Sequence, residues 1–152
     1  MTISYFDTSA LAKLLIDEEG STEAADLWNA AAVVVVGRLA YPEARAALAA
    51  TERDRRVTPR AHLDAARELE RIWTSLTVVE VAPGIAHTAG ELAATRALRG
   101  YDAVHLATAL AATGGTGVLV TWDRLLAEAA LAEGLAIAPP LDHAAGFGRA
   151  LR

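Results

Sequence analysis

Four carboxylates stand at points of the sequence where a strand ends or a helix begins. Asp7 follows the apolar stretch ISYF, and Asp123 follows GVLVT after one intervening residue. Glu43 comes directly after Pro42, and Asp102 lies near the start of the helical stretch GYDAVHLATAL. Acidic residues are also common as helix caps and in first helical turns, so each residue alone has a purely structural explanation. Only their combination suggests chemistry.

Strands and helices alternate along the chain, as in parallel α/β proteins. Apolar runs predict strands at residues 3–6, 33–36, 77–81, 117–121 and 135–137, and the Val run at 33–36 is expected to be buried on both faces. Helical patterns with Pro, Gly and Thr signals predict helices at about 9–17, 21–31, from 39–42 onward, 58–75, 83–99, 100–113 and 123–134. Gly100 is expected to end the helix that begins at Pro83. The two helices between the second and third strands predict a helical hairpin that projects from the sheet.

This topology brings the four acids together. Helices that follow parallel strands begin at the edge where the strands end, and ligands bind at that edge. Carboxylates gathered in one cleft repel each other, and a divalent cation removes the conflict. Oxygen ligands suit Mg²⁺ or Mn²⁺, which polarise a phosphodiester and activate water. The pattern therefore predicts metal-assisted cleavage of an anionic polymer.

Composition narrows the function classes. The 152 residues suit a single domain, which we expect at residues 1–139 with a tail at 140–152. Cysteine is absent, which excludes disulfides and a cysteine nucleophile and fits a reducing cytoplasm. No stretch approaches the roughly 20 apolar residues of a membrane span. A net charge of −5 argues against a protein that coats nucleic acid, although eight of 13 arginines lie between Arg38 and Arg71. Ion-paired helix faces are the favoured explanation of that arginine-rich segment.

Four stretches resemble the motifs of the PIN-domain ribonucleases, and more closely those of the VapC-type toxins of bacterial toxin–antitoxin modules. They are FDTSALAKLL, AYPEARAAL, YDAVHLATAL and VTWDRLLAEAALAEGL. The resemblance covers residues 1–139 in the family's order and spacing. It implies a single PIN-like, Rossmann-like three-layer α/β domain with a parallel sheet of about five strands. It also implies a cytoplasmic endoribonuclease that depends on Mg²⁺ or Mn²⁺.

The resemblance also assigns roles to the four acids. Asp7, Glu43, Asp102 and Asp123 would form the catalytic quartet. Asp7 and Asp102 would be direct metal ligands. Glu43 and Asp123 would act through water or hold a second ion. Metal-activated water, rather than a side chain, would then attack the RNA phosphodiester.

Neighbouring polar residues receive supporting roles. By the same resemblance, Thr8, Ser9 and Thr121 would offer hydroxyl groups to water or phosphate. Lys13 and Arg45 are candidate RNA contacts, but positions facing solvent remain open for both. The family also implies a homodimer and a VapB-like antitoxin whose C-terminal segment blocks the acidic pocket, often with a basic side chain. No membrane partner is expected.

Two other functions stay open. One is a non-catalytic PIN module that binds RNA or a protein partner. The other is a phosphatase that uses Asp7 as its nucleophile, which the sequence disfavours because Ser9 stands where such enzymes usually carry a second aspartate. His105, three residues after Asp102, is expected to be a packed, hydrogen-bonded residue, while contact with the acids or the substrate remains an alternative.

Overall fold

The computed structural model describes residues 2–141, so residues 142–152 of the predicted tail lie outside the described residues. The centre of the molecule is a five-stranded sheet in the order β3-β2-β1-β4-β5, and every neighbouring pair is parallel. The strands are β1 (Ile3–Phe6), β2 (Val33–Gly37), β3 (Thr77–Val79), β4 (Val118–Val120) and β5 (Ala136–Ala138). The predicted parallel α/β architecture with about five strands is confirmed.

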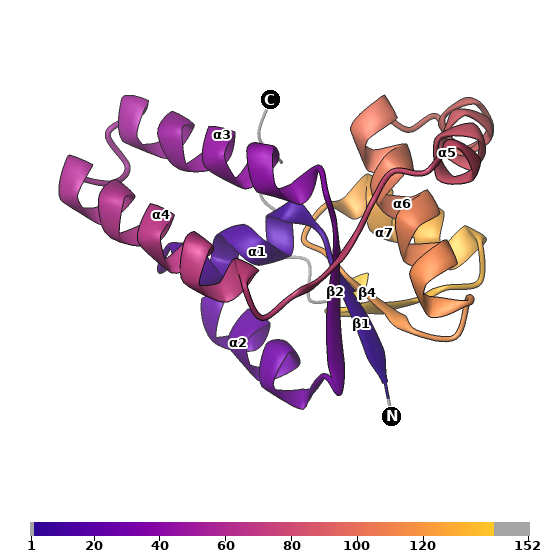
Figure 1. Ribbon diagram of the computed structural model, residues 1–152, viewed down its shortest axis with the longest axis horizontal. Helices are drawn as coiled ribbons and strands as arrows, with labels where there is room; N and C mark the ends of the chain where they lie inside the picture. The colour runs from indigo at the N-terminus through magenta and orange to yellow at the C-terminus, as the bar shows by residue number, and fades with distance from the viewer. Residues whose placement is uncertain (1, 142–152) are drawn as a thin grey trace.

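Helices lie on both sides of this sheet and complete three layers (Figure 1). On one side are α1 (Thr8–Leu15), α2 (Ser21–Ala30), α3 (Ala40–Arg53) and α4 (Pro59–Trp73). On the other side are α5 (Pro83–Arg96), α6 (Gly100–Thr113) and α7 (Arg124–Ala132). The chain thus passes from one side of the sheet to the other after β3, and each side contributes helices to the edge where the strands end.

Alternation along the strands divides the core in two, because successive strand residues point to opposite faces. The strand residues packed with α5, α6 and α7 are Tyr5, Val35 and Leu119. The strand residues packed with α1, α2 and α4 are Phe6, Val36 and Val120. The expectation that residues 33–36 would be buried throughout is wrong for the first of them. Val33 lies at the end of β2 remote from the core and is 41% exposed.

The predicted helical hairpin consists of α3 and α4, which pack against each other and extend away from the sheet (Figure 1). Leu48 on α3 and Leu69 on α4 are fully buried, although neither lies against a strand. Thr58 begins α4 as its cap, since its hydroxyl accepts a hydrogen bond from the amide of Ala61 at 3.1 Å and Pro59 follows as the first helical residue. Both helices of the hairpin also pack against α1, so apolar packing supports the hairpin where it extends from the sheet.

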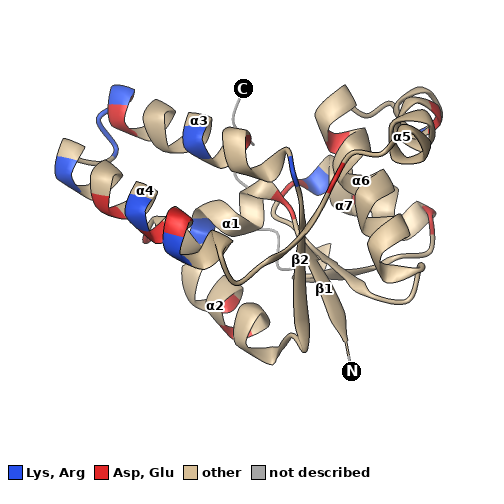
Figure 2. Ribbon diagram, in the orientation of Figure 1, with Lys and Arg blue, Asp and Glu red and all other residues tan. Residues whose placement is uncertain are grey.

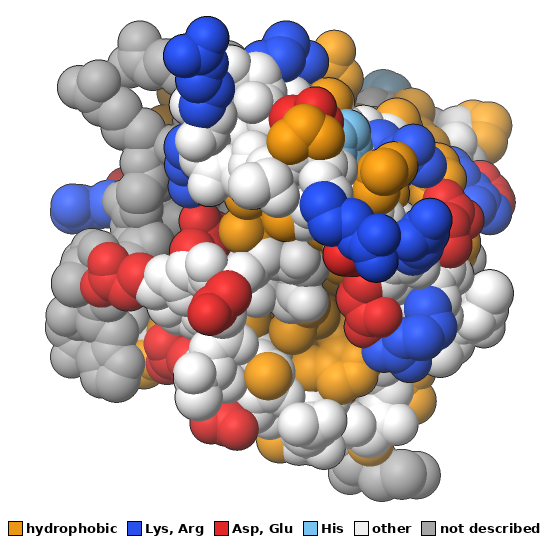
Figure 3. Space-filling view, turned by 90° about the vertical axis from the view of Figure 1, so that its left-hand side faces the viewer, with side chains coloured by type: hydrophobic (Ala, Val, Ile, Leu, Met, Phe, Trp, Pro, Cys, Tyr) orange, Lys and Arg blue, Asp and Glu red, His pale blue; other side chains and the backbone are white. Residues whose placement is uncertain are grey.

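The arginine-rich segment coincides with this hairpin, and basic residues are spread along α3 and α4 (Figure 2). Most of these arginines face carboxylates. The ion pairs are Arg38–Glu80, Arg45–Glu70, Arg56–Glu18, Arg60–Asp64, Arg67–Asp64 and Arg71–Glu68. Figure 3 shows this end of the molecule, where basic and acidic side chains are interspersed. The favoured explanation of ion-paired helix faces is confirmed for Arg45, Arg60, Arg67 and Arg71, whereas Arg38 and Arg56 form their ion pairs outside the two helices.

The end of α5 differs from its prediction and fixes the start of α6. Ala97, rather than Gly100, adopts the left-handed conformation with φ 52°, and it ends α5 at Arg96. Gly100 instead begins α6. As a result Arg99 is not a helical residue of α5 but the residue that immediately precedes α6. Within residues 2–141, no helix has the length and apolar character needed to cross a membrane.

Candidate active site

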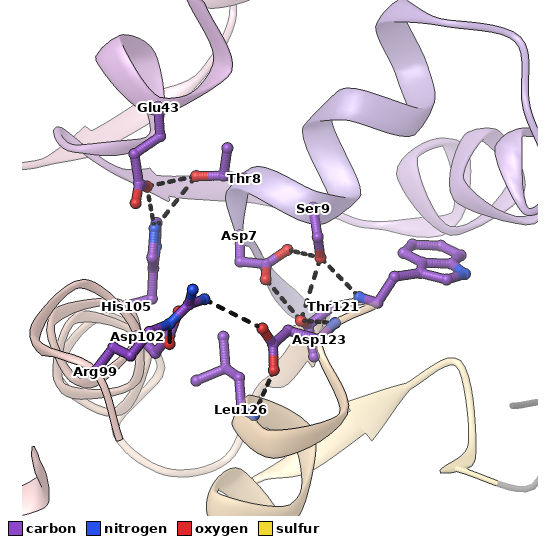
Figure 4. A network of polar contacts seen from close by, with 11 residues as sticks. Asp7, Thr8, Ser9, Glu43, Arg99, Asp102, His105, Thr121, Asp123 and Leu126 are labelled. Atoms are coloured by element: carbon purple, nitrogen blue, oxygen red, sulfur yellow. Dashed lines mark hydrogen bonds and ion pairs between the residues drawn. The ribbon is translucent and has the colours of Figure 1, made fainter. Parts of the chain in front are cut away.

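A cavity of about 480 Å³ opens where β1 and β4 end. Its acidic lining includes the four predicted carboxylates, Asp7, Glu43, Asp102 and Asp123. They come from four separate segments: the residue after β1, the first turns of α3 and α6, and the residue before α7. Figure 4 shows these side chains around a common space. The structure thus brings the four acids together, while their catalytic roles remain predictions.

Asp7 is both a helix cap and a wall of the cavity. One carboxylate oxygen accepts hydrogen bonds from the amide of Ala10 at 2.9 Å and the hydroxyl of Ser9 at 2.7 Å. The other oxygen accepts from the Thr121 hydroxyl at 2.6 Å. The residue is only 3% exposed, and burial raises the pKa of its carboxyl group, although His105 and the three hydrogen bonds oppose that rise. Three hydrogen bonds therefore fix the carboxylate of Asp7, and keeping it ionised in this buried position costs free energy.

Glu43 is held from two sides. The hydroxyl of Thr8 donates to its Oε2 at 2.6 Å, and Nε2 of His105 lies 2.6 Å from the same oxygen. Burial alone would raise the pKa of this carboxyl group. The hydrogen bond and charge of His105, the Thr8 bond and the charge of Arg99 outweigh burial and lower the pKa. Glu43 therefore keeps its negative charge at neutral pH.

His105 positions Glu43 through one ring nitrogen and contacts Tyr5 through the other. It is buried, its Nδ1 lies 2.9 Å from the Tyr5 hydroxyl, and the two rings meet edge to face. Burial would lower the pKa of His105, but the hydrogen bond and charge of Glu43, with Asp7 and Asp102, raise it. The expectation of a packed, hydrogen-bonded histidine is confirmed, and its contact with an acid, which the sequence left open, is also present. Spacing alone could not show that Tyr5 would be its second partner.

Asp102 and Asp123 share one arginine that sequence reasoning did not single out. Nε of Arg99 donates to Oδ2 of Asp102 at 2.8 Å, and its Nη2 lies 3.7 Å from Oδ2 of Asp123 (Figure 4). Asp123 also caps α7, because its carboxylate accepts from the amide of Leu126 at 3.0 Å. The one available sequence signal for Arg99 is its position three residues before Asp102, a spacing at which helical side chains meet.

The two predicted RNA contacts lie in different surroundings. Lys13 lines the cavity, but its ammonium group donates to the backbone oxygen of Glu19 at 2.7 Å and to Glu18 at 3.2 Å. Arg45 is not among the residues that line the cavity, and its Nη1 lies 3.3 Å from Glu70 on the hairpin. The roles proposed for both residues in RNA binding remain predictions.

The donor chemistry of the cavity suits a hard divalent cation. Four carboxylates and the hydroxyl groups of Thr8 and Ser9 offer oxygen ligands, which Mg²⁺ and Mn²⁺ prefer. Thr121 is fully buried and does not line the cavity, and its hydroxyl donates to Asp7 and accepts from the amide of Asp123. As the side chains stand in residues 2–141, no three Asp, Glu, His or Cys residues form a group that could hold a metal ion. Each carboxylate is turned toward a protein donor instead. The residues fit a cation by their chemistry, and binding requires some of these partners to be exchanged.

Comparisons with known proteins agree with the geometry. The PIN domain family model matches residues 4–131. Ribonuclease VapC49 of Mycobacterium tuberculosis (strain ATCC 25618 / H37Rv) is 45% identical over 139 residues, which cover 91% of this chain and 96% of VapC49. The crystal structure of PAE2754 from Pyrobaculum aerophilum matches with a TM-score of 0.66 at 26% identity, covering 90% of this chain and 83% of that chain.

A toxin–antitoxin complex from Klebsiella pneumoniae contains a chain that matches with a TM-score of 0.58. The identity is 17%, and the match covers 79% of this chain and 86% of that chain, so the likeness concerns the fold. The family match over most of the sequence and the 45% identity to VapC49 lead to one conclusion. The chain belongs to the PIN-domain family, and within it to the VapC ribonucleases that its four motifs resemble.

Proposed function

We propose that this protein is an endoribonuclease that requires Mg²⁺ or Mn²⁺ and acts as the toxin of a toxin–antitoxin module. The observation that carries the proposal is the set of four carboxylates, drawn from four separate segments, that lines one cavity of about 480 Å³. The identity of 45% to a protein named as a ribonuclease supports the same reaction class. Oxygen-rich sites of this kind suit metal-assisted hydrolysis of a phosphodiester.

In this proposal Asp7 and Asp102 bind the cation directly, while Glu43 and Asp123 act through water or hold a second ion. A bound divalent cation would supply a Lewis acid that polarises the phosphodiester and lowers the pKa of a nearby water. The protein's contribution is to keep these side chains charged and oriented. Glu43, with its lowered pKa, meets both requirements before any ligand arrives. At Asp7 the hydrogen bonds fix the orientation of the carboxylate and only partly offset the rise in pKa that burial causes.

Orientation comes from the hydroxyl groups beside the acids. Ser9 and Thr121 donate to opposite oxygens of Asp7, so its carboxylate plane is fixed relative to the cavity. Glu43, with its lowered pKa, remains an acceptor for a proton or for a hydrogen bond from water. His105 keeps that carboxylate in place, and its Nε2 also lies 3.3 Å from the hydroxyl of Thr8, which donates a hydrogen bond to Glu43. The resemblance to the PIN-domain ribonucleases implies that no side chain attacks the phosphodiester. Water is therefore the proposed nucleophile.

The shape of the cavity also favours a polymeric substrate. Beyond the acids its walls are α1 and α3, with Ala12, Ala46 and Ala50 among the apolar lining residues. Farther from the acids, Arg53 at the end of α3 and Arg56 in the turn after it also line the cavity, and Arg56 pairs there with Glu18. A strand of RNA can place one phosphate at the acids, where cations compensate the charge, and a neighbouring phosphate at the arginines.

Membership of the VapC group suggests the partners. We propose a VapB-like antitoxin that inserts a basic side chain among the four carboxylates, a homodimeric toxin and action in the cytoplasm. The Klebsiella pneumoniae relative is itself a toxin–antitoxin complex, which is consistent with this proposal. The cluster of Asp7, Glu43, Asp102 and Asp123 attracts a basic side chain for the same reason that it attracts a metal cation.

The proposal is tested by RNA cleavage with the purified chain. A mixed cellular RNA pool is incubated with Mg²⁺, with Mn²⁺ or with chelator, and fragments are resolved by sequencing their ends. The variants Asp7→Asn and Asp102→Asn remove charge at the proposed ligands. Asp64→Asn is the matched control, because Asp64 pairs with Arg60 and Arg67 on α4 and does not line the cavity.

We expect discrete fragments that need a divalent cation, persist in Asp64→Asn and disappear in the two site variants. Fragments that survive in chelator would contradict metal dependence. Intact RNA in every reaction, from a folded protein that binds the cation, would instead favour a non-catalytic PIN module. Release of phosphate from small phosphomonoesters without RNA cleavage would favour the phosphatase alternative.

A further inference from the structure

Arg99 occupies an unusual place at the edge of the cavity. Its backbone is fixed at the start of α6, where its carbonyl oxygen accepts from the amide of Ala103 at 2.9 Å. Its guanidinium group lies across two acids, 2.8 Å from Asp102 and 3.7 Å from Asp123. The arginine side chain is 57% exposed, whereas the two aspartate side chains are 14% and 12% exposed. A cation that faces solvent thus covers two shielded anions.

Arg99, Asp102 and Asp123 carry one positive and two negative charges, so the negative charge is only partly neutralised. Two aspartates drawn from different helices would repel each other in a shielded place, and a guanidinium between them relieves that repulsion. Among residues 2–141, the ion pairs of Asp102 and of Asp123 are both made with Arg99. The carboxylate oxygens that Arg99 contacts are among those a divalent cation would need. A carboxylate oxygen cannot bind the guanidinium group and a divalent cation at full strength together, so Arg99 and the divalent cation must compete for the two aspartates.

We propose that Arg99 is an internal counter-ion that competes with the divalent cation for Asp102 and Asp123. The inference rests on the proposed function, because it presumes that a divalent cation binds there. In the metal-free protein the guanidinium holds the two acids together and stabilises the open cavity. When the cation enters, Arg99 turns toward solvent, at little cost because more than half of the side chain is already exposed. Arg99 therefore sets the cation concentration at which the site fills.

The test measures cation binding without RNA. Isothermal calorimetry with Mn²⁺ compares the natural chain, Arg99→Gln and Arg99→Lys. Arg124→Gln is the matched control, because Arg124 directly follows Asp123 in the chain but its Nε lies 2.8 Å from Glu128 instead. It removes the same charge close to the site without removing a contact to the two acids. Arg99→Lys keeps the charge and loses the planar fork, and it serves if Arg99→Gln folds poorly.

We expect Arg99→Gln to bind Mn²⁺ roughly three- to tenfold more tightly, which is the range expected from releasing a half-exposed guanidinium from two carboxylates. Arg99→Lys should fall between the natural chain and Arg99→Gln, and Arg124→Gln should stay within about twofold of the natural chain. In chelator the melting temperature of Arg99→Gln should fall by roughly 2–4 °C, because the two acids lose their counter-ion. Saturating Mn²⁺ should remove most of that difference.

Unchanged or weaker Mn²⁺ binding by Arg99→Gln would overturn the inference, as would an equal gain of affinity in Arg124→Gln. Either result would leave the proposed nuclease intact, because the natural chain would still bind the cation. Absence of Mn²⁺ binding in every variant, including the natural chain, would overturn the proposed metal dependence itself and this inference with it. The two failures are therefore distinguishable.

Discussion

Nε2 of His105 on α6 lies 2.6 Å from Oε2 of Glu43 on α3, although the two helices cover opposite sides of the sheet. The other ring nitrogen lies 2.9 Å from the hydroxyl of Tyr5 on β1. A continuous chain of polar contacts thus runs from the central strand to the cavity. Each member limits the orientation of the next, so Glu43 is positioned by His105, which lines the cavity, and through it by Tyr5, which is not among the lining residues.

Replacing His105 should therefore cost stability as well as position. In His105→Ala the buried Tyr5 hydroxyl loses its hydrogen bond to the imidazole and a cavity forms beside the Tyr5 ring, so we expect the free energy of unfolding to fall by about 2–4 kcal/mol. Urea unfolding followed by circular dichroism measures the change. His87→Ala, at a site on α5 whose side chain is 80% exposed, is the matched control and should change stability by less than about 0.5 kcal/mol. A loss in His105→Ala no larger than the control's would show that the chain of contacts is not stabilising.

The pKa shifts predict how stability depends on pH in the metal-free protein. Glu43 raises the pKa of His105 in the folded state despite burial, so the stability from the charged imidazole is complete below its ordinary pKa of about 6.5. That stability is lost as the pH rises through the raised value. Burial raises the pKa of Asp7 as well, and the resulting loss of stability begins at that group's ordinary pKa of about 3.9, below the range considered for His105.

We therefore expect the free energy of unfolding, measured in chelator, to decrease as the pH rises above about 6.5. The slope for one linked proton is at most about 1.4 kcal/mol per pH unit. In His105→Gln the histidine's part of this slope should vanish. A stability that increases from pH 6.5 to pH 8.5 would mean that the folded state does not favour the protonated imidazole, contrary to the raised pKa of His105.

Replacing Asp7 should stabilise the metal-free protein, because the proposed function requires a negative charge at a buried position. Its charge is buried, and burial raises its pKa, so the neutral isostere in Asp7→Asn should raise the free energy of unfolding at pH 8 by about 1 kcal/mol. The amide oxygen of Asn can still accept from Ala10 and cap α1. The comparison is urea unfolding in chelator, with Asp64→Asn on the exposed face of α4 as the control. A loss of stability in Asp7→Asn would mean that the hydrogen bonds from Ser9 and Thr121 outweigh the cost of burial.

Local signals explain why much of the fold and the acidic set could be predicted. Pro59 and Pro83 mark helix starts, and β-branched runs mark strands, because both effects act within a few residues. The four acids lie in one cavity because parallel topology forces helix starts and strand ends to one edge. The edge of the sheet at which the four acids meet could therefore be predicted from the sequence.

The partners of the acids could not be predicted in the same way. His105 meets Glu43 across 62 residues of sequence, and only the packing of α6 beside the end of β1 sets that contact. Arg99 reaches Asp102 and Asp123 because α5 ends early, at a left-handed Ala97 where glycine would be preferred. A single alanine in that conformation is a tertiary effect that overrides local preference.

The far end of the cavity leads to a prediction about RNA binding. Arg53, at the end of α3, and Arg56, in the turn after it, line this end, where a second phosphate of a bound strand would lie. If each arginine neutralises one phosphate, the slope of log affinity against log salt should flatten by about 0.7 for each arginine removed. Affinity for a single-stranded RNA with non-cleavable 2′-O-methyl groups should fall roughly threefold in Arg53→Gln and in Arg56→Gln at moderate salt.

Arg71→Gln separates this local effect from a general loss of positive charge. Arg71 lies on the same hairpin, but it pairs with Glu68 on the surface of α4 and does not line the cavity. Fluorescence anisotropy at three or more salt concentrations gives both affinity and slope for each variant. We expect Arg71→Gln to keep the slope of the natural chain, because its guanidinium contacts no phosphate. Equal changes in all three variants would mean that the hairpin attracts RNA through its overall field, and that the strand does not follow the cavity between α1 and α3.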